Sequence, residues 1–266
     1  MRVEVNKDYS FGEDQYLFKY IDIHKLIYFL YSENLFFSPL SYFDDPLEGI
    51  SQKVLADNHE ENGLVNQNAN EENVHNKVLQ DDEKQQHYQN YLDKVQRQLF
   101  ASCWFLGLRE SLAMWESYSN NDSVALRFKP DYLCNHMIGQ FSKLNDNNFD
   151  LMAHGKVEYF KLSPFDPNDE ALKQSKHRFP GFIKDLSYKH EEEFRFLLMQ
   201  QHNKEQYNFF EFSPGPLKEL EFDIITHPYM ENWKHKNIQT ILENLDLKDK
   251  LKKSEIPIRR QIFKTA

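Results

Sequence analysis

The sequence is poor in cysteine, with only Cys103 and Cys134 among its 266 residues. Two cysteines cannot form a disulfide framework or a cysteine-based zinc site, so a reducing compartment is expected. Glycine and proline are also scarce, at eight and ten residues, which argues against collagen-like and linker-rich chains. No apolar run approaches the roughly 18 residues of a membrane span. Because Met1–Ser10 also lacks an apolar run, we expect no signal peptide and a cytoplasmic protein without membrane contact.

Basic residues are fewer than acidic ones, 32 against 42, which gives a formal net charge of -10. An acidic chain does not follow a phosphate backbone by bulk charge, which argues against general coating of nucleic acid. What the chain has in abundance is large rings, 22 Phe, 14 Tyr and 3 Trp, and these indicate a folded interior. We expect a single domain over residues 1–266, with a polar and partly helical insertion at about 52–86, where Asn, Gln, Glu and Asp dominate.

The chain begins with an alternation of strand and helix. Tyr16–Ile21 is a short apolar and aromatic run that predicts a strand. Asp22 is placed to cap a helix after it. The apolar positions of this helix have the spacing of one buried stripe and are Ile23, Leu26, Ile27 and Leu30.

Helical signals recur in three later places. Helices are expected from Tyr88 onward, after a cap at Ser111, and over Trp233–Leu245, with a helical turn at Phe182–Leu186. The further strands that we expect are Leu35–Ser38, Phe100–Phe105, Ser123–Phe128, Val157–Phe160, His190–Met199, Tyr207–Phe212, Leu220–Ile225 and Ile256–Ile258. The order has no regular βαβ rhythm, and no Gly-rich phosphate loop follows a strand, so an α+β fold is favoured over a doubly wound one.

The run His190–Met199 divides by parity into two faces. Phe194, Phe196 and Leu198 point toward the core, whereas Glu191, Glu193, Arg195 and Leu197 point the other way. The charged face can be a solvated, self-neutralising ladder. The functional alternative is a pair of carboxylates at a cleft, one of them oriented by Arg195 and able to stabilise an oxocarbenium-like centre.

Two further groups of residues have a plain and a functional interpretation. Asp44, Asp45 and Glu48 surround a turn before proline, or hold a divalent metal, for which the pattern is weak. Trp115 and Tyr118 lie three positions apart on one helix face. They either pack in the core or form a ring platform for a base or nicotinamide. The eleven histidines have no metal-binding spacing, and we expect no metal site.

Five motifs in a fixed order resemble a known family. They are Leu17-Phe-Lys-Tyr20, Leu35-Phe-Phe-Ser-Pro39, Phe43-Asp-Asp-Pro-Leu-Glu48, Met114-Trp115-x-x-Tyr118 and Glu191-x-Glu193-x-Arg195. Together they resemble the bacterial domain of unknown function 2971, over roughly residues 16–200. Members of that family look like effectors of phage defence or stress responses, and the resemblance implies such a role here.

A second similarity, at the level of the fold, is to ADP-ribosyltransferases. There the first strand carries a His or Arg that holds NAD, the next strand ends in a small hydroxyl residue, and a late strand carries a catalytic glutamate. The similarity places Lys19 and Ser38 at the first two positions, and Glu193 at the glutamate with Glu191 ahead of it. It implies a single α+β domain whose split, mostly antiparallel sheet is flanked by helices.

The two resemblances together imply an ADP-ribosyltransferase-like enzyme that uses NAD as its substrate, with no metal. Glu193, Glu191 and Arg195 are the catalytic residues that they imply. The residues expected to bind NAD are Lys19, Tyr20, Ser38, Asp45, Glu48, Trp115 and Tyr118. The acceptor would be a phage or host protein, or nucleic acid.

Two alternatives belong to other functional classes. The protein could be a non-catalytic module of a defence system that recognises a nucleotide or a protein with the same cleft. It could also be a nuclease, which would require a metal ion that the sequence gives little reason to expect. The oligomeric state is left open.

Overall fold

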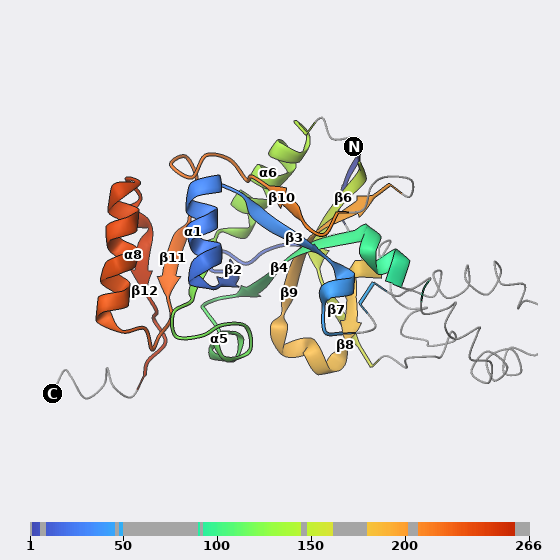
Figure 1. Ribbon diagram of the computed structural model, residues 1–266. Coiled ribbons are helices and arrows are strands. Elements are labelled where there is room, and N and C mark those ends of the chain that lie inside the picture. Colours follow the sequence, from blue (N-terminus) through green and yellow to red (C-terminus); the bar gives the residue numbers. More distant parts are fainter. Residues whose placement is uncertain are drawn as a thin grey trace, which may run out of the picture.

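The computed structural model describes residues 2–5, 9–45, 48–49, 90, 93–144, 148–161, 180–201 and 207–258. Within these residues the fold is α+β, as predicted: a mixed, mostly antiparallel sheet of ten strands carries helices on both faces (Figure 1). The insertion expected at 52–86 and the start of the helix expected from Tyr88 lie outside the described residues. Of the helices described here, none has the length and apolar character needed to cross a lipid bilayer.

The path of the main sheet runs β1-β6-β9-β4-β2-β5-β11-β12, and β3 joins it by pairing with β4 and with β10. These strands are β1 (Arg2–Val5), β2 (Tyr16–Ile21), β3 (Leu35–Pro39), β4 (Leu99–Gly107), β5 (Val124–Phe128), β6 (Phe149–Lys156), β9 (Glu193–Gln200), β10 (Phe210–Phe212), β11 (Asp223–Thr226) and β12 (Leu251–Lys253). A separate two-stranded sheet contains β7 (Glu158–Phe160) and β8 (Ile183–Asp185).

The α-helices with described bounds are α1 (Ile23–Ser32), α5 (Leu112–Tyr118), α6 (Pro130–Phe141) and α8 (Asn232–Asn244). Residues 93–98 are also helical. Short 3-10 turns are η1 (Leu40–Tyr42), η2 (Pro180–Phe182), η3 (Leu186–Glu191) and η4 (Lys248–Lys250).

Both predicted helix caps are confirmed. Asp22 accepts a hydrogen bond from the backbone N–H of Lys25, and Ser111 accepts one from that of Met114. Each cap satisfies a backbone donor that has no partner inside its helix. Ile27, expected on the buried stripe of α1, is exposed instead, because the buried positions of that helix are Leu26, Phe29 and Leu30.

Five expected elements differ in the structure. The strands expected over Tyr207–Phe212 and Leu220–Ile225 begin only at Phe210 and Asp223. The strand expected over His190–Met199 begins only at Glu193, because Leu186–Glu191 form the turn η3. The segment Phe182–Leu186 is mostly the strand β8 rather than a helical turn. Ile256–Ile258 is not a strand, although both isoleucines are buried, and the last strand is β12 instead.

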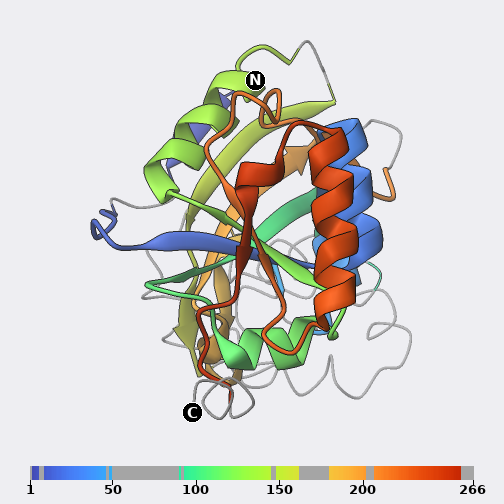
Figure 2. The ribbon, with the colours of Figure 1, turned by 90° about the vertical axis from the view of Figure 1, so that its left-hand side faces the viewer.

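The two faces of the sheet bury different clusters. α1, α6 and α8 cover one face over the main core, to which Trp104 and Phe194 belong, and Figure 2 shows the molecule from the side of α8, with α6 at the upper left. On the other face, a second cluster includes Leu40 and Leu197. A third cluster on that face holds Trp115 of α5. The strands of the sheet centre are therefore buried on both faces.

One edge of β4 is only partly paired with neighbouring strands. β2 pairs with β4 only over Tyr16–Phe18, and β3 pairs with β4 only at Ser38 and Pro39, opposite Ala101 and Phe100. On the other side of β4, the pairing with β9 is continuous. On the edge of β4 that faces β2 and β3, the residues between the two paired stretches have no neighbouring strand. The candidate site lies at this gap.

Candidate functional site

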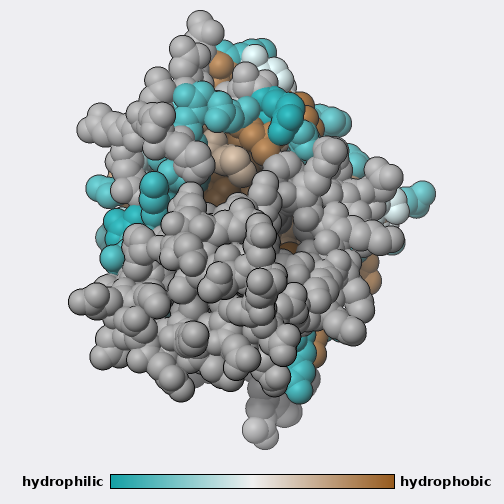
Figure 3. Space-filling model, turned by 90° about the vertical axis from the view of Figure 1, so that its right-hand side faces the viewer, coloured by the Kyte–Doolittle hydropathy of each residue, from teal (hydrophilic) through white to brown (hydrophobic). Residues whose placement is uncertain are grey.

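A cavity of about 530 Å³ lies at the gap between β2, β3 and β4. Its walls include residues from both faces of the sheet, since Trp104 belongs to the main core and Phe18 to the third cluster. Cavities of this size commonly accommodate part or all of a small organic ligand. Figure 3 shows the face of the molecule on the right-hand side of Figure 1, where hydrophobic side chains lie between hydrophilic ones.

Five of the predicted site residues line this cavity. They are Lys19, Tyr20, Ser38, Tyr118 and Glu193. Three elements far apart in the chain supply the polar ones: β2 carries Lys19, β3 carries Ser38, and β9 begins with Glu193. The structure thus brings these side chains to one concave surface.

The other predicted residues do not border the cavity. Asp45, Glu48, Glu191 and Arg195 are buried behind it. Glu191 is not on β9 but ends η3, and Glu192, in the left-handed region at φ 39°, separates the two. The expectation of one strand face holding both carboxylates is therefore corrected: a turn and a strand hold them.

Trp115 does not form a ring platform. Its side chain is fully buried in the third cluster, and its indole N–H donates to Glu110 Oε2 at 2.8 Å. The same carboxylate accepts from the backbone N–H of Glu255 at 2.7 Å. Trp115 thus follows the plain interpretation, core packing, while Tyr118 on the same helix reaches the cavity.

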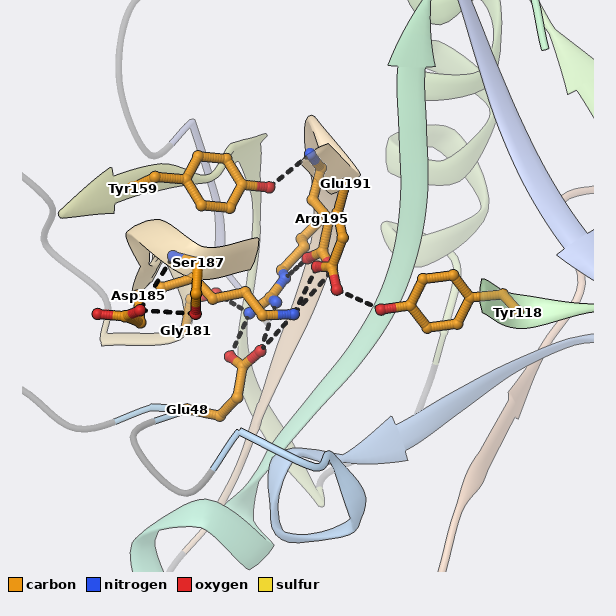
Figure 4. Close-up of polar contacts among 10 residues, drawn as sticks. Glu48, Tyr118, Tyr159, Gly181, Asp185, Ser187, Glu191 and Arg195 are labelled. Carbon is orange, nitrogen blue, oxygen red and sulfur yellow. Dashed lines mark hydrogen bonds and ion pairs between the residues drawn. The ribbon is translucent and has the colours of Figure 1, made fainter. Parts of the chain in front are cut away.

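A buried ion cluster contains Glu48, Glu191 and Arg195, which Figure 4 shows, together with Lys184 and Glu193. Arg195 donates to both carboxylate oxygens of Glu48, each at 2.7 Å, and its Nε donates to Glu193. A further bond runs from Arg195 Nη1 to the carbonyl oxygen of Gly181 at 2.8 Å. These four hydrogen bonds fix the guanidinium, so Arg195 holds Glu193 in place. Arg195 itself does not border the cavity.

Lys184 is the cluster member that sequence reasoning missed. Its ammonium lies 2.5 Å from Glu191 and 3.3 Å from both Glu48 and Glu193. Burial lowers its tendency to be charged, but Glu193 and Glu48 outweigh this and raise the pKa of Lys184. A single lysine between Ile183 and Asp185 has no motif, so no local pattern could have identified it.

The pKa values of Glu191 and Glu193 are shifted in opposite directions. Burial, and then the neighbouring Glu193, raise the pKa of Glu191. For Glu193, burial also disfavours the ionised form, but the charges of Arg195 and Lys184 outweigh burial and lower its pKa. Glu193 is therefore an ionised carboxylate at neutral pH, next to a second carboxyl group that binds a proton more readily.

Tyr118 connects this second carboxyl group to the cavity. Its phenol O–H donates to Glu191, and the ring lines the cavity. Burial and the bond to Glu191 both raise the pKa of Tyr118, so the phenol stays protonated and keeps donating. Glu191 is thus connected to the cavity through Tyr118 and, by its ion pair, through Lys184.

Lys19 lies across the gap in the sheet. Its Nζ donates to Ser102 Oγ at 3.1 Å and to the carbonyl oxygen of Cys103 at 3.2 Å, and it lies 5.4 Å from the Trp104 ring centroid. The amine thereby satisfies polar groups of β4 in the stretch where β2 does not pair with it. Burial lowers the pKa of Lys19 to about 8.

Among the described residues, no group of His, Cys, Asp and Glu side chains is placed to hold a metal ion. In the ion cluster, the positions that a cation would take are filled by Lys184 and Arg195. Asp45, part of the weak metal pattern, is buried near this cluster rather than exposed in a turn, and Pro46 lies outside the described residues.

Comparison with known proteins gives one match. No curated protein and no solved structure matches the chain. The matching family model covers the cavity and cluster residues Met114, Tyr118, Lys184, Glu191, Glu193 and Arg195. Residues 114–196 match the family described as protein of unknown function (DUF2971), and the predicted resemblance is thus confirmed over this segment.

Proposed function

We propose that the protein is an ADP-ribosyltransferase-like enzyme that cleaves NAD at the bond between nicotinamide and ribose. The observation that supports this best is Glu193, a buried carboxylate at the wall of a cavity of about 530 Å³. The split between β2 and β4, with Lys19 on one side and Ser38 on β3, is compatible with the fold-level similarity that the sequence suggested.

Charge at the cavity wall suits this reaction. When nicotinamide leaves, the bonding electrons go with it and positive charge develops at the anomeric carbon. A fixed, ionised carboxylate stabilises that charge at little reorganisation cost. The three carboxylates of the cluster, Glu48, Glu191 and Glu193, exceed its two cations, Lys184 and Arg195, by one when all are ionised.

The remaining walls suit the other parts of NAD. Tyr42 and Phe209 line the cavity with 61% and 51% of their surface exposed, and so offer ring faces for a base or nicotinamide. Lys25 provides positive charge for the diphosphate, and Lys19 and Ser38 provide an amine and a hydroxyl for hydrogen bonds to the ribose. In this arrangement Glu191 and Arg195 are positioning residues, because neither borders the cavity.

The experiment is release of nicotinamide from NAD by the purified protein, measured by chromatography with protein and nucleic-acid acceptors present. We expect release by the wild type and a loss of at least about a hundredfold in Glu193→Gln, the scale of removing one preorganised electrostatic group. Glu193→Asp keeps the charge but withdraws the carboxylate by one methylene group, so we expect an intermediate rate.

Glu110→Gln is the matched control. Glu110 is also a buried carboxylate with two donors, but it does not line the cavity. We expect its nicotinamide release to equal that of the wild type once both variants are shown to be folded by circular dichroism. Absence of release by the wild type with every acceptor would overturn the proposal.

A non-catalytic recognition module is the second candidate function. It is favoured by the pairing of Glu193 with both Arg195 and Lys184, since a carboxylate so fully bonded has little freedom to act on a substrate. In that case NAD or a related nucleotide would raise the melting temperature and be recovered unchanged. The same protein preparation therefore distinguishes the two candidates.

The cellular role that we propose is that of an effector in bacterial anti-phage or stress defence, with a phage or host protein or nucleic acid as acceptor. The support is the family resemblance. Expression of the wild type and of Glu193→Gln in bacteria challenged with phage tests this role, and equal protection by both would overturn an enzymatic effector.

A further inference from the structure

Three lysines line the cavity, and their surroundings differ. They are Lys19, Lys25 and Lys184. Lys184 contacts three carboxylates, and Lys25 is exposed with Asp22 at 3.8 Å. Within the described part of the chain, no ion pair includes Lys19. Its two bonds go to a hydroxyl and a carbonyl oxygen, which are both neutral.

The bonds of Lys19 suit a neutral amine. An unprotonated amine has two N–H donors and one lone pair, and Ser102 Oγ and the Cys103 carbonyl oxygen accept one donor each. The lone pair is then left for another partner. Burial is the main cause of the lowered pKa of Lys19; Lys25 lowers it further, whereas Cys103 and Glu193 act in the opposite direction.

We propose that Lys19 is a nucleophile that forms an imine with a small aldehyde or ketone bound in the cavity. The amine attacks the carbonyl carbon, a carbinolamine forms, and the carbonyl oxygen leaves with both amine hydrogens as one molecule of water. A desolvated lysine in a largely apolar pocket is the usual setting for this chemistry. The lowered pKa of Lys19 agrees with the geometry.

The surroundings of Lys19 narrow the ligand class. Trp104, Phe36 and Phe209 supply aromatic walls to the cavity, and Lys25 supplies an exposed cation. A planar carbonyl compound with an anionic group satisfies both features. This inference does not depend on NAD cleavage, because it concerns only the amine of Lys19 and the walls around it.

The test uses pyridoxal 5′-phosphate as an aromatic aldehyde probe with an anionic group. The full-length protein is treated with the probe at neutral pH, reduced with borohydride to convert the imine into a stable secondary amine, and mapped by peptide mass spectrometry. At pH 7 a pKa near 8 leaves roughly two hundredfold more neutral amine than an ordinary lysine has. We therefore expect Lys19 to be labelled at least about tenfold faster than Lys25.

Two arginine variants make the result specific. Lys19→Arg keeps the positive charge but has no amine able to form an imine, so the fast labelling should disappear. Lys218→Arg, at an exposed lysine that does not line the cavity, should leave the labelling of Lys19 unchanged. The proposal is overturned if the label on Lys19 forms no faster than on Lys25, or if fast labelling survives in Lys19→Arg at another lysine. Nicotinamide release from NAD is a separate readout, so the two proposals can fail independently.

Discussion

Arg195 and Glu48 form a two-point ion pair in which neither side chain is exposed to solvent, with both nitrogen–oxygen distances at 2.7 Å. The two residues lie 147 positions apart in the chain. This pair fixes the short segment around Glu48 against β9. It also determines where Arg195 places the carboxylate of Glu193.

Removal of Glu48 should destabilise the fold strongly. In Glu48→Ala, the guanidinium of Arg195 stays buried and loses two of its bonds, and breaking a buried pair in this way typically costs about 3–5 kcal/mol. We expect the free energy of unfolding in urea to fall by that amount. Lys218→Ala is the control, because the pair of Lys218 with Asp246 is exposed and should contribute nothing measurable. Equal stability of the two variants would contradict this prediction.

The sequence predicted the local elements of this fold well. Asp22 and Ser111 cap their helices as expected, because the bonds of a cap join residues only three apart. The prediction that Phe194, Phe196 and Leu198 of β9 point into the core was also confirmed, since all three belong to the main cluster. The strands β1 and β6 were missed, and so was the helix α6, although Pro130 at its start and the spacing of its buried residues were signals of a helix.

The ion cluster could not be predicted, for a physical reason. A charged strand face is solvated unless other segments cover it, and the covering residues Glu48 and Lys184 come from parts of the chain with no pattern that links them to Arg195. Sequence order also could not show that β2 separates from β4 beyond Phe18, which creates the cavity.

The stability of the protein should depend on pH through His154. Burial lowers its pKa to about 4, from an ordinary value of 6.5. Because the unfolded chain then binds the proton more tightly than the folded one, stability is complete above pH 6.5 and falls as the pH drops toward 4. The expected slope from this residue is about 1.4 kcal/mol per pH unit.

Urea denaturation of the wild type and of His154→Gln between pH 7 and pH 4 measures this contribution. We expect the variant to lose less stability than the wild type over that interval, even if it is less stable at pH 7 for want of the bond to Tyr9. Parallel pH curves for the two proteins would show that His154 does not carry the dependence.

Tyr118 should control the protonation of Glu191. The hydrogen bond from Tyr118 favours the ionised form of Glu191, which burial and Glu193 disfavour. In Tyr118→Phe this bond is lost, so the pKa of Glu191 should rise further. Infrared difference titration of the buried carboxyl groups measures the shift. Tyr159→Phe is the control, because the hydroxyl oxygen of Tyr159 accepts from the backbone N–H of Glu193. A downward shift in Tyr118→Phe would rule out this role.

Trp115 should matter for stability and not for the ligand. In Trp115→Phe, Glu110 keeps the backbone donor from Glu255 but loses the indole donor, and a buried acceptor so weakened typically costs about 1–3 kcal/mol. Trp233→Phe, which removes an exposed indole donor to Glu231, should leave stability unchanged. We expect Trp115→Phe to bind NAD as the wild type does and Phe209→Ala to bind it more weakly, because only Phe209 lines the cavity. A loss of NAD affinity in Trp115→Phe as large as in Phe209→Ala would contradict this prediction and indicate that Trp115 contacts the ligand.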